Sequence, residues 1–235
     1  MKFIIDLILD MLYPRRCPVC HKILKENGWL ACPECVGKLK TVGKEYCMKC
    51  GKPVEKHQEY CEVCGKTPRK FTEGRAVFLY DRTMKNSLLK FKYGGRREYG
   101  RFYIKTMCSA AKNEIKRWKP DVIIPVPLHR KKYRARGFNQ AEYLARGIGK
   151  HFDIPVSAEI VKKVKNTKSQ KKLNAQDRRN NLDHAFSVCE EIKGLRILVI
   201  DDVYTTGSTM EEIAEALTRE GAEKVYFLTL CIGYN

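Results

Sequence analysis

Eight of the eleven cysteines form four Cys-x-x-Cys pairs near the start of the 235-residue sequence. Two cysteines spaced in this way on a tight turn can hold one tetrahedral ion, and two such turns complete a four-cysteine zinc site. One Cys-x-x-Cys pair would be weak evidence because redox motifs share it, but four pairs in a chain without an export signal favour structural zinc over disulfides or a redox centre. The sequence therefore predicts two structural zinc ions, and the expected ligands are Cys17, Cys20, Cys32, Cys35, Cys47, Cys50, Cys61 and Cys64.

The spacing leaves open which cysteine turns share an ion. Joining the first turn to the second and the third to the fourth is the simplest arrangement, and a crossed arrangement fits the same spacing. In both arrangements the protein fills all four positions around each ion, which is typical of structural zinc. We expect His21 and His57 to be exposed to solvent rather than bound to metal. The remaining cysteines, Cys108, Cys189 and Cys231, are expected to be small core residues.

A second chemical signature follows the apolar stretch 195–200, where Asp201 and Asp202 lead into the turn Thr205-Thr-Gly-Ser-Thr209. Glycine lets the backbone come close to a ligand, and the free amides at the start of a helix bind anions. The two carboxylates would lie beside the anion, where they can hold sugar hydroxyls or hydrated Mg²⁺. An ordinary strand–turn–helix with an acidic cap does not require both the carboxylate pair and four hydroxyl side chains around one glycine. We therefore predict a phosphate monoester site, distinct from the nucleoside-triphosphate loop, whose Gly-Lys-Ser/Thr ending does not occur here.

Alternating strands and helices must position this turn. Apolar runs predict strands over residues 74–80, 121–126, 156–164, 195–200 and 224–231. Periodicity and capping signals predict helices over residues 83–92, 99–118, 140–150 and 208–220. Such alternation implies crossover connections, so the expected fold class is α/β with a parallel sheet covered on both faces. Residues 1–12 are expected to form a separate amphipathic helix.

The chain carries 46 basic and 27 acidic residues, and the resulting net charge of +19 favours polyanionic partners. Its 43% hydrophobic content excludes wholesale disorder. No apolar run approaches the roughly 20 residues of a membrane-spanning helix, so we expect a cytoplasmic protein without a membrane span.

Two basic runs contain aromatic residues, a combination with which single-strand binders track a backbone and stack on bases. The candidate nucleic-acid contacts are Lys92, Arg96, Arg97, Arg101, Arg134 and Arg136. The alternative is that the aromatic side chains belong to the core and the charges to a solvated surface.

Four sequence blocks are similar to those of a known family. Residues 199–209 resemble the phosphoribosyl-pyrophosphate signature of type I phosphoribosyltransferases. Three further blocks occur in the same order: Pro125-Val-Pro-Leu-His129, Arg136-Gly-Phe-Asn-Gln140, and Gln170-x-x-Leu173 followed by Arg178 and Asn181. Together with the preceding cysteine pairs, this combination resembles the ComF family, which is named for competence in natural transformation.

The resemblance implies a small double zinc ribbon over residues 13–70 and a type I phosphoribosyltransferase-like domain over residues 71–235. In that domain Asp201 and Asp202 would bind the ribose hydroxyls, directly or with Mg²⁺. The residues implied to bind phosphate or phosphoribosyl pyrophosphate are Asp201, Asp202, Val203, Tyr204, Thr205, Thr206, Gly207, Ser208, Thr209, Leu128, His129 and Arg130.

The candidate catalytic residues are Asp201, Asp202, Arg178 and His129. Residues 165–183 match the flexible loop of type I enzymes, and their basic side chains could clamp pyrophosphate, with Arg178 as the best candidate. A solvated basic loop without a ligand is the alternative. His129 could transfer a proton, bind pyrophosphate or form a structural hydrogen bond.

Two classes of function follow. The first is a DNA-uptake protein that binds phosphoribosyl pyrophosphate or a related nucleotide with Mg²⁺, and single-stranded DNA, with a helicase or DNA-processing protein as a candidate partner. The second is an active phosphoribosyltransferase of nucleotide salvage, acting on an unidentified base. No base-specificity pocket is recognisable, and the basic excess exceeds what one pyrophosphate needs, so we expect the first class. Catalytic activity, acceptor base and oligomeric state stay open at this point.

Overall fold

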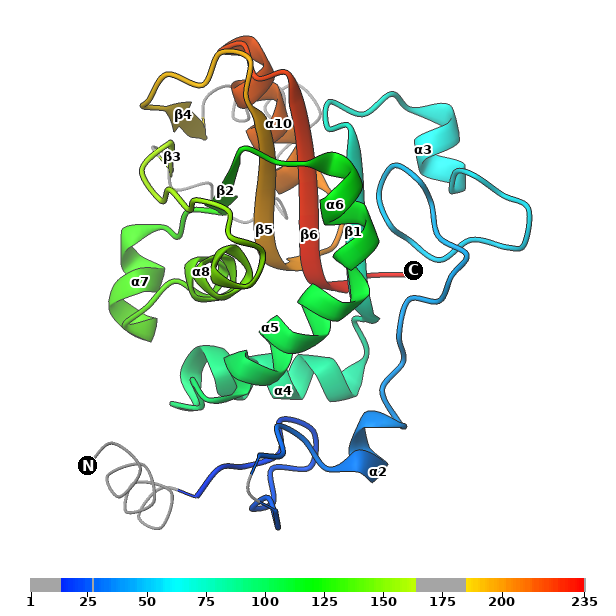
Figure 1. The fold of residues 1–235 in the computed structure, drawn as a ribbon, viewed down its shortest axis with the longest axis vertical. Coiled ribbons are helices and arrows are strands. Elements are labelled where there is room, and N and C mark those ends of the chain that lie inside the picture. The colour runs from blue at the N-terminus through cyan, green and yellow to red at the C-terminus, as the bar shows by residue number, and fades with distance from the viewer. Residues whose placement is uncertain (1–13, 27, 164–184, 235) are drawn as a thin grey trace, which may run out of the picture.

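The computed structural model describes residues 14–26, 28–163 and 185–234. Among them, four parallel strands form the central sheet in the order β1-β6-β5-β2 (Figure 1). The strand bounds are Glu73–Leu79 for β1, Val122–Pro125 for β2, Arg196–Tyr204 for β5 and Lys224–Ile232 for β6. The predicted α/β class with a parallel sheet is confirmed. Strand β5 is central and ends at the predicted phosphate turn.

Helices cover both faces of this sheet. Their bounds are Arg82–Tyr93 for α4, Tyr99–Ala110 for α5, Lys112–Trp118 for α6, Arg130–Arg136 for α7, Gln140–Phe152 for α8 and Ser208–Arg219 for α10. Successive residues of a strand point to opposite faces, so β5 contributes to two cores. Leu198 and Ile200 pack in the core that contains α4, α5 and α8, whereas Ile197 and Val199 pack in the core that contains α10.

The cysteine-rich segment lies along the edge of this body and includes two short helices, α2 (Pro33–Val36) and α3 (Glu62–Lys66) (Figure 1). Its two halves pack against different cores. Cys17 belongs to the core beneath α4 and α5, while Cys47 and Cys50 belong to the core that contains α10. The second half is therefore packed on the same side of the sheet as the helix that follows the phosphate turn.

Two predicted elements differ from the structure. The single helix expected over 99–118 is divided into α5 and α6 at the buried Ala111, whose dihedral angles of −109° and 14° are not helical. No glycine or proline marks this break. The strand expected over 156–164 is largely wrong, because Val156 forms only an isolated bridge and a short strand, β3 (Val161–Lys163), pairs antiparallel with β4 (Phe186–Val188) outside the main sheet.

Three further expectations concern single segments or residues. Cys108 and Cys231 are buried as expected, but Cys189 is exposed because it directly follows the short strand β4 at the margin of the protein. The expected helix over 1–12 and the basic loop 165–183, with Arg178, lie outside the described residues. In the part of the chain that the structure describes, no helix is both long and apolar enough to cross a membrane.

Candidate metal centres and phosphate site

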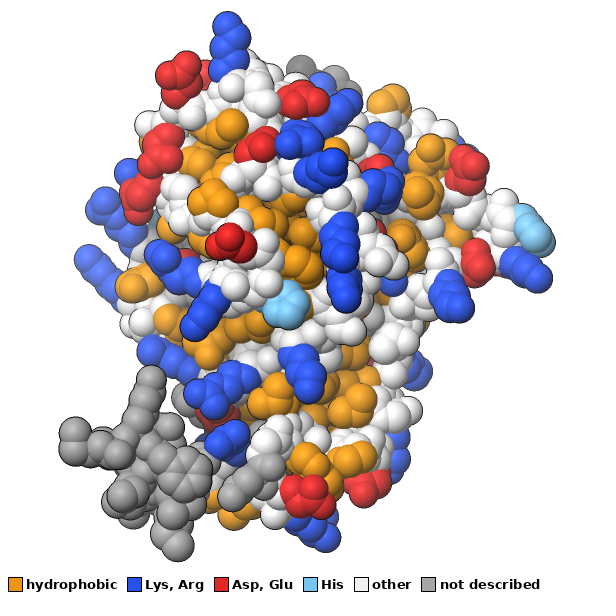
Figure 2. Space-filling model, in the orientation of Figure 1, with side chains coloured by type: hydrophobic (Ala, Val, Ile, Leu, Met, Phe, Trp, Pro, Cys, Tyr) orange, Lys and Arg blue, Asp and Glu red, His pale blue; other side chains and the backbone are white. Residues whose placement is uncertain are grey.

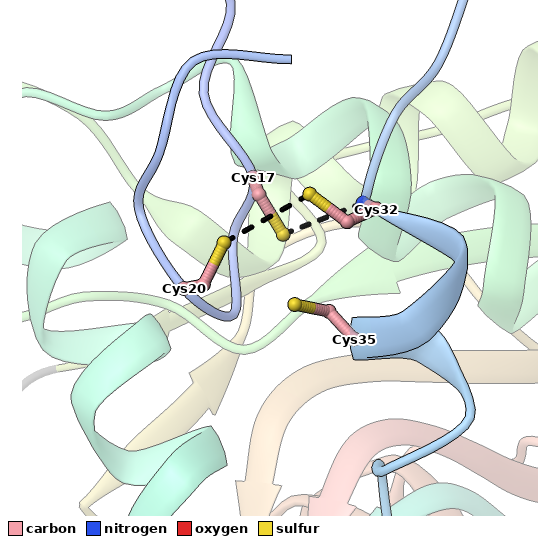
Figure 3. Close-up of side chains that lie close together, drawn as sticks. All are labelled: Cys17, Cys20, Cys32 and Cys35. Carbon is pink, nitrogen blue, oxygen red and sulfur yellow. Dashed lines mark hydrogen bonds between the residues drawn. The ribbon is translucent and has the colours of Figure 1, made fainter. Parts of the chain in front are cut away.

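The eight predicted ligands gather into two groups of four. Cys17, Cys20, Cys32 and Cys35 form the first cluster, and Cys47, Cys50, Cys61 and Cys64 form the second cluster. Within each cluster all four sulfur atoms lie within 4.8 Å of one another, and Figure 3 shows those of the first cluster converging. Four thiolate donors at this separation suit a tetrahedral zinc ion. The turns are therefore joined sequentially, first with second and third with fourth, and the crossed arrangement does not occur.

The first turn of each cluster has the same backbone geometry. The amide of Cys17 donates to Lys22 O at 2.9 Å, and the amide of Cys47 donates to Lys52 O at 2.7 Å. The residue after the second cysteine is left-handed in both turns, with φ of 64° at His21 and 71° at Gly51. The two clusters are thus repeats of one structural unit, which supports the assignment of two equivalent zinc sites.

His21 and His57 are not members of either cluster, as expected. His57 is exposed, but His21 is half-buried, which corrects the expectation of solvent exposure. The Nδ1 atom of His21 lies 2.9 Å from the hydroxyl of the buried Tyr99 in α5. His21 therefore joins the first cluster to the body of the protein.

We expect purified protein to contain close to two zinc ions per chain, and Cys17→Ser to retain about one. Loss of one thiolate disables a four-ligand site, while the second cluster keeps its own ligands. Metal analysis after gel filtration measures both values, and Cys189→Ser is the control because it replaces an exposed cysteine outside both clusters. A folded cysteine-rich segment without metal would contradict the prediction.

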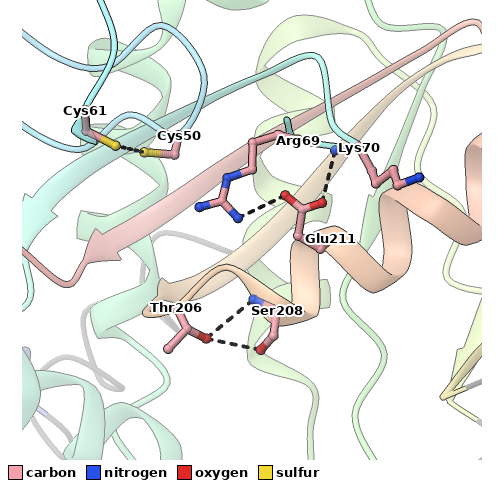
Figure 4. A network of polar contacts seen from close by, with 7 residues as sticks. All are labelled: Cys50, Cys61, Arg69, Lys70, Thr206, Ser208 and Glu211. Carbon is pink, nitrogen blue, oxygen red and sulfur yellow. Dashed lines mark hydrogen bonds and ion pairs between the residues drawn. The ribbon is translucent and has the colours of Figure 1, made fainter. Parts of the chain in front are cut away.

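The predicted phosphate turn joins the end of β5 to the start of α10. We call residues 205–209 the phosphate loop. Gly207 has φ of 88°, a left-handed conformation, and a Cβ atom at this position would collide with the hydroxyl of Tyr204. The Thr206 and Ser208 hydroxyl oxygens lie 3.2 Å apart in front of the helix N-terminus (Figure 4). Because Thr205 and Thr206 are exposed, the loop presents hydroxyls and helix-terminal amides to solvent, an arrangement that suits an anion.

The side chain of Tyr204 lies beneath the phosphate loop. It is buried, and its ring stacks on Phe227 with 5.0 Å between centroids. Sequence reasoning places Tyr204 among the phosphate-binding residues. The structure makes it part of the support of the loop.

The two carboxylates at the end of β5 have different surroundings. The buried Asp202 forms an ion pair with Lys92 of α4, on the side of the sheet that α4 covers. Burial, and then the neighbouring Asp202 carboxylate, raise the pKa of Asp201. A nearby cation would favour the ionised form, so the pair is suited to a hard divalent ion such as Mg²⁺, which prefers oxygen ligands.

Sequence reasoning missed Lys163, which interacts with Asp201, and Glu212, which interacts with Lys163. Lys163 of β3 lies over the Phe186 ring at 5.1 Å, and Glu212 is in α10. Burial, and then Lys132 of α7, lower the pKa of Lys163, while Glu212 and Asp201 act in the opposite direction. These groups come together because β4, which pairs with β3, packs against α10, so no local pattern in the sequence signals them.

The segment Leu128–Arg130 follows β2, whose Pro125 lies in register with Ile200 of β5. It therefore borders the same edge of the sheet as Asp201. His129 is the N-cap of α7, and its Nδ1 accepts a hydrogen bond from the Lys131 amide at 3.2 Å. This contact gives His129 a structural hydrogen bond, one of the three roles considered above, and leaves its Nε2 for a ligand.

The two basic runs meet through aromatic contacts. Arg136 of α7 lies over the Tyr93 ring at 4.7 Å and donates to its hydroxyl at 2.6 Å. Arg97 lies over Phe138 at 4.6 Å. Tyr93 is 56% exposed, so its outer surface is open to a ligand. We call the exposed surface formed by α4, α7, the segment between α4 and α5, and the start of α5 the basic–aromatic surface.

Other members of the basic runs have different surroundings. Tyr99, Phe102 and Tyr103 are core residues, whereas Tyr133 is 49% exposed. Lys92 is held by Asp202 at the end of β5 instead of on the outer surface. On the face of the molecule in Figure 2, lysine and arginine side chains are widely distributed with fewer acidic ones among them. Tyr99, Phe102 and Tyr103 thus follow the alternative in which the aromatic residues belong to the core, whereas Tyr93 and Tyr133 are exposed.

This fold and these sites define a phosphoribosyltransferase-type domain preceded by two cysteine zinc ribbons. The family model "Double zinc ribbon domain" matches residues 8–65, and the model "Phosphoribosyl transferase domain" matches residues 104–234, more than half of the chain. The chain belongs to the ComF family, whose members combine these two parts.

Three relatives illustrate the similarity. The chain is 31% identical to DNA utilization protein YhgH of Escherichia coli O157:H7 over 93% of this chain and 97% of that protein. It is 30% identical to Competence protein ComFC of Bacillus subtilis over 81% of this chain and 78% of that protein. It is 44% identical to Competence protein F of Haemophilus influenzae, where the match spans 45% of this chain and just under half, 48%, of that protein.

Proposed function

We propose that the chain binds phosphoribosyl pyrophosphate, or a related nucleotide, together with Mg²⁺ at the end of β5, and acts on single-stranded DNA during DNA uptake. The observation that carries the proposal is the phosphate loop itself, with Gly207 in a left-handed conformation and exposed hydroxyls beside an acidic pair. A helix N-terminus with such hydroxyls suits a phosphate monoester, and adjacent carboxylates suit sugar hydroxyls.

Each residue of the site has a role in this proposal. Residues 205–209 bind the 5-phosphate, with Val203 and Tyr204 supporting them. Asp201 and Asp202 bind the ribose hydroxyls and hold Mg²⁺, which would supply positive charge to the pyrophosphate when bound. Leu128, His129 and Arg130 border the pyrophosphate, and Arg178, outside the described residues, is the candidate clamp. Lys92 orients Asp202 through their ion pair.

The DNA-uptake part of the proposal is supported by the names of the relatives, which are competence and DNA utilization proteins. The basic–aromatic surface offers what a single strand requires, namely exposed rings for stacking and arginines for the phosphates. Tyr93 and Tyr133 are the exposed rings, and Arg97, Arg101 and Arg134 are exposed basic side chains. Lys92 is held by Asp202 and is less accessible to DNA. Arg96 and Arg136 are partly buried, so we assign these two to orienting the surface.

A second candidate function is an active phosphoribosyltransferase, because the same loop would present phosphoribosyl pyrophosphate to a base. Pyrophosphate release in the presence of Mg²⁺ and a panel of bases distinguishes the two. The proposed function predicts no base-dependent turnover together with measurable DNA affinity. Base-dependent turnover that Asp201→Asn removes, without DNA affinity, would establish the transferase instead.

We expect single-stranded DNA affinity to fall steeply with salt and to depend on the basic–aromatic surface. The triple variant Arg97→Gln, Arg101→Gln, Arg134→Gln should weaken binding for all sequences. It should also reduce the slope of log affinity against log salt by about 2, since each lost phosphate contact on a single strand contributes about 0.7. Fluorescence anisotropy with a labelled oligonucleotide at several salt concentrations measures both quantities.

The matched control removes three exposed positive charges at the opposite end of the strands, with Lys193→Gln, Arg219→Gln and Lys224→Gln. It carries the same net charge as the test variant and should bind almost as tightly as the unmodified protein. Equal loss of affinity in both variants would mean that net charge, rather than this surface, binds DNA.

A further inference from the structure

We infer that Arg69 is a positioning residue that connects the second zinc cluster to the phosphate loop. The inference deepens the proposed function and rests on it for the identity of the ligand, but not for the contacts. Arg69 lies in the segment between the second cluster and β1, and only 11% of its side chain is exposed. A buried guanidinium needs several partners, and those of Arg69 belong to both features.

The contacts form a chain from one feature to the other. The Arg69 guanidinium interacts with the Cys64 side chain of the second cluster, and Cys64 packs against the core that contains Phe71 and Tyr204. Its Nη1 donates to Oε1 of Glu211 at 3.3 Å, and the amide of Lys70 donates to Oε2 of Glu211 at 3.0 Å. Figure 4 shows both donors converging on Glu211 in the first turn of α10. A carboxylate held at both oxygens is fixed in position.

Because the Glu211 side chain is held in position, the Glu211 backbone also constrains the phosphate loop. The Glu211 amide donates to the carbonyl of Gly207 at 2.9 Å, closing the first turn of α10. Gly207 is the N-cap of that helix and the central residue of the phosphate loop. A shift of Glu211 therefore moves the residue around which the loop turns.

The same segment supports the other end of the loop. Phe71 packs edge-on against Tyr204 at 6.5 Å and against Phe227 at 4.9 Å between centroids. Tyr204 lies directly beneath Gly207. Residues 69–71 thus contact both the strand end and the helix start that the loop joins.

Charge gives Arg69 a second effect on an anionic ligand. The Glu211 carboxylate lies in the first turn of a helix whose N-terminus would bind phosphate, where an unpaired negative charge opposes an anion. The ion pair with Arg69 neutralises it. Zinc bound at the second cluster would keep Cys64 as a fixed thiolate, and so keep this guanidinium in place.

Hydrogen exchange in the absence of any ligand tests the mechanical connection. In Arg69→Met, amides of residues 204–211 should exchange about tenfold faster or more, because hydrogen bonds to charged partners are lost. Lys70→Met is the matched control, since its side chain is 59% exposed and pairs with Glu215 one turn further along α10. Both variants should retain two zinc ions. Unchanged exchange in Arg69→Met, or loss of its second zinc, would overturn the inference.

Thermodynamic linkage between ligand binding at the phosphate loop and opening of the second cluster provides a further test. This measurement would not change if Arg69 only stabilised the fold. If the cluster and the loop are coupled, a ligand on the loop must slow the opening of the cluster. Phosphoribosyl pyrophosphate with Mg²⁺ should therefore slow alkylation of Cys47, Cys50, Cys61 and Cys64 by N-ethylmaleimide, followed by mass spectrometry, and leave the first cluster unaffected. Arg69→Met should lose this protection at saturating ligand. Equal protection in both proteins would contradict the inference.

The double variant Arg69→Met with Glu211→Gln distinguishes the effect of charge from the effect of the connection between cluster and loop. It removes the Glu211 carboxylate that Arg69→Met leaves unpaired. Compared with Arg69→Met, it should therefore recover part of the ligand affinity but none of the cysteine protection. Full recovery of protection would exclude Arg69 as the connection. If the unmodified protein does not bind phosphoribosyl pyrophosphate, the proposed function fails, whereas the ligand-free exchange comparison still decides the inference.

Discussion

Replacing Gly207 by alanine is expected to abolish most of the stabilisation that phosphoribosyl pyrophosphate confers. A residue with a Cβ atom costs about 1–2 kcal/mol in the left-handed conformation. The added atom would also collide with the buried Tyr204 hydroxyl, so the loop must move. Since the strain alone corresponds to about a tenfold change in an equilibrium constant, we expect affinity to fall by more than this factor. Isothermal titration in the presence of Mg²⁺ measures it.

Gly194→Ala is the matched control for this substitution. Gly194 also has a left-handed conformation, with φ of 77°, but a Cβ atom added there would have no neighbour within 4 Å, and the residue is in the turn before β5. The control should lose comparable intrinsic stability and keep its ligand affinity. Equal affinities in the two variants would show that the loop does not depend on its glycine.

The features that can be predicted from the sequence are those set by local spacing. The cysteine turns and the run from Asp201 to Thr209 each place their chemistry within a few residues, so a short stretch of chain is sufficient. The parallel sheet is predictable because each buried strand is a short apolar run bounded by turn signals. Only the pairing of the cysteine turns requires the folded chain, since two arrangements fit one spacing.

Features that depend on contacts between distant segments could not be predicted. The pairing of Lys92 with Asp202, and of Arg136 with Tyr93, joins segments that are far apart in the sequence. From the sequence alone, the charges of both basic runs are candidate DNA contacts, but the fold divides the charges and rings of these runs between the site, the core and the solvent. The break at Ala111 likewise follows from tertiary packing, because alanine favours a continuous helix.

The second large effect is expected from the acidic pair. Phosphoribosyl pyrophosphate at about 100 times its dissociation constant should stabilise the unmodified protein by about 2.7 kcal/mol when Mg²⁺ is present. Asp201→Asn with Asp202→Asn should remove this stabilisation, because neutral amides hold Mg²⁺ far more weakly than carboxylates do. Asp201→Asn alone keeps the ion pair between Lys92 and Asp202. Loss of ligand-induced stabilisation in this variant can therefore be assigned to ligand binding rather than to a folding defect.

The most direct test of the central claim is the ligand-induced change in unfolding free energy, measured with phosphoribosyl pyrophosphate and Mg²⁺ on the unmodified protein, Asp201→Asn and the double variant. We predict a clear increase for the unmodified protein and little or none for either variant, with all three folded and containing two zinc ions. An equal increase in all three proteins would contradict the account, since the ligand would then bind away from the end of β5.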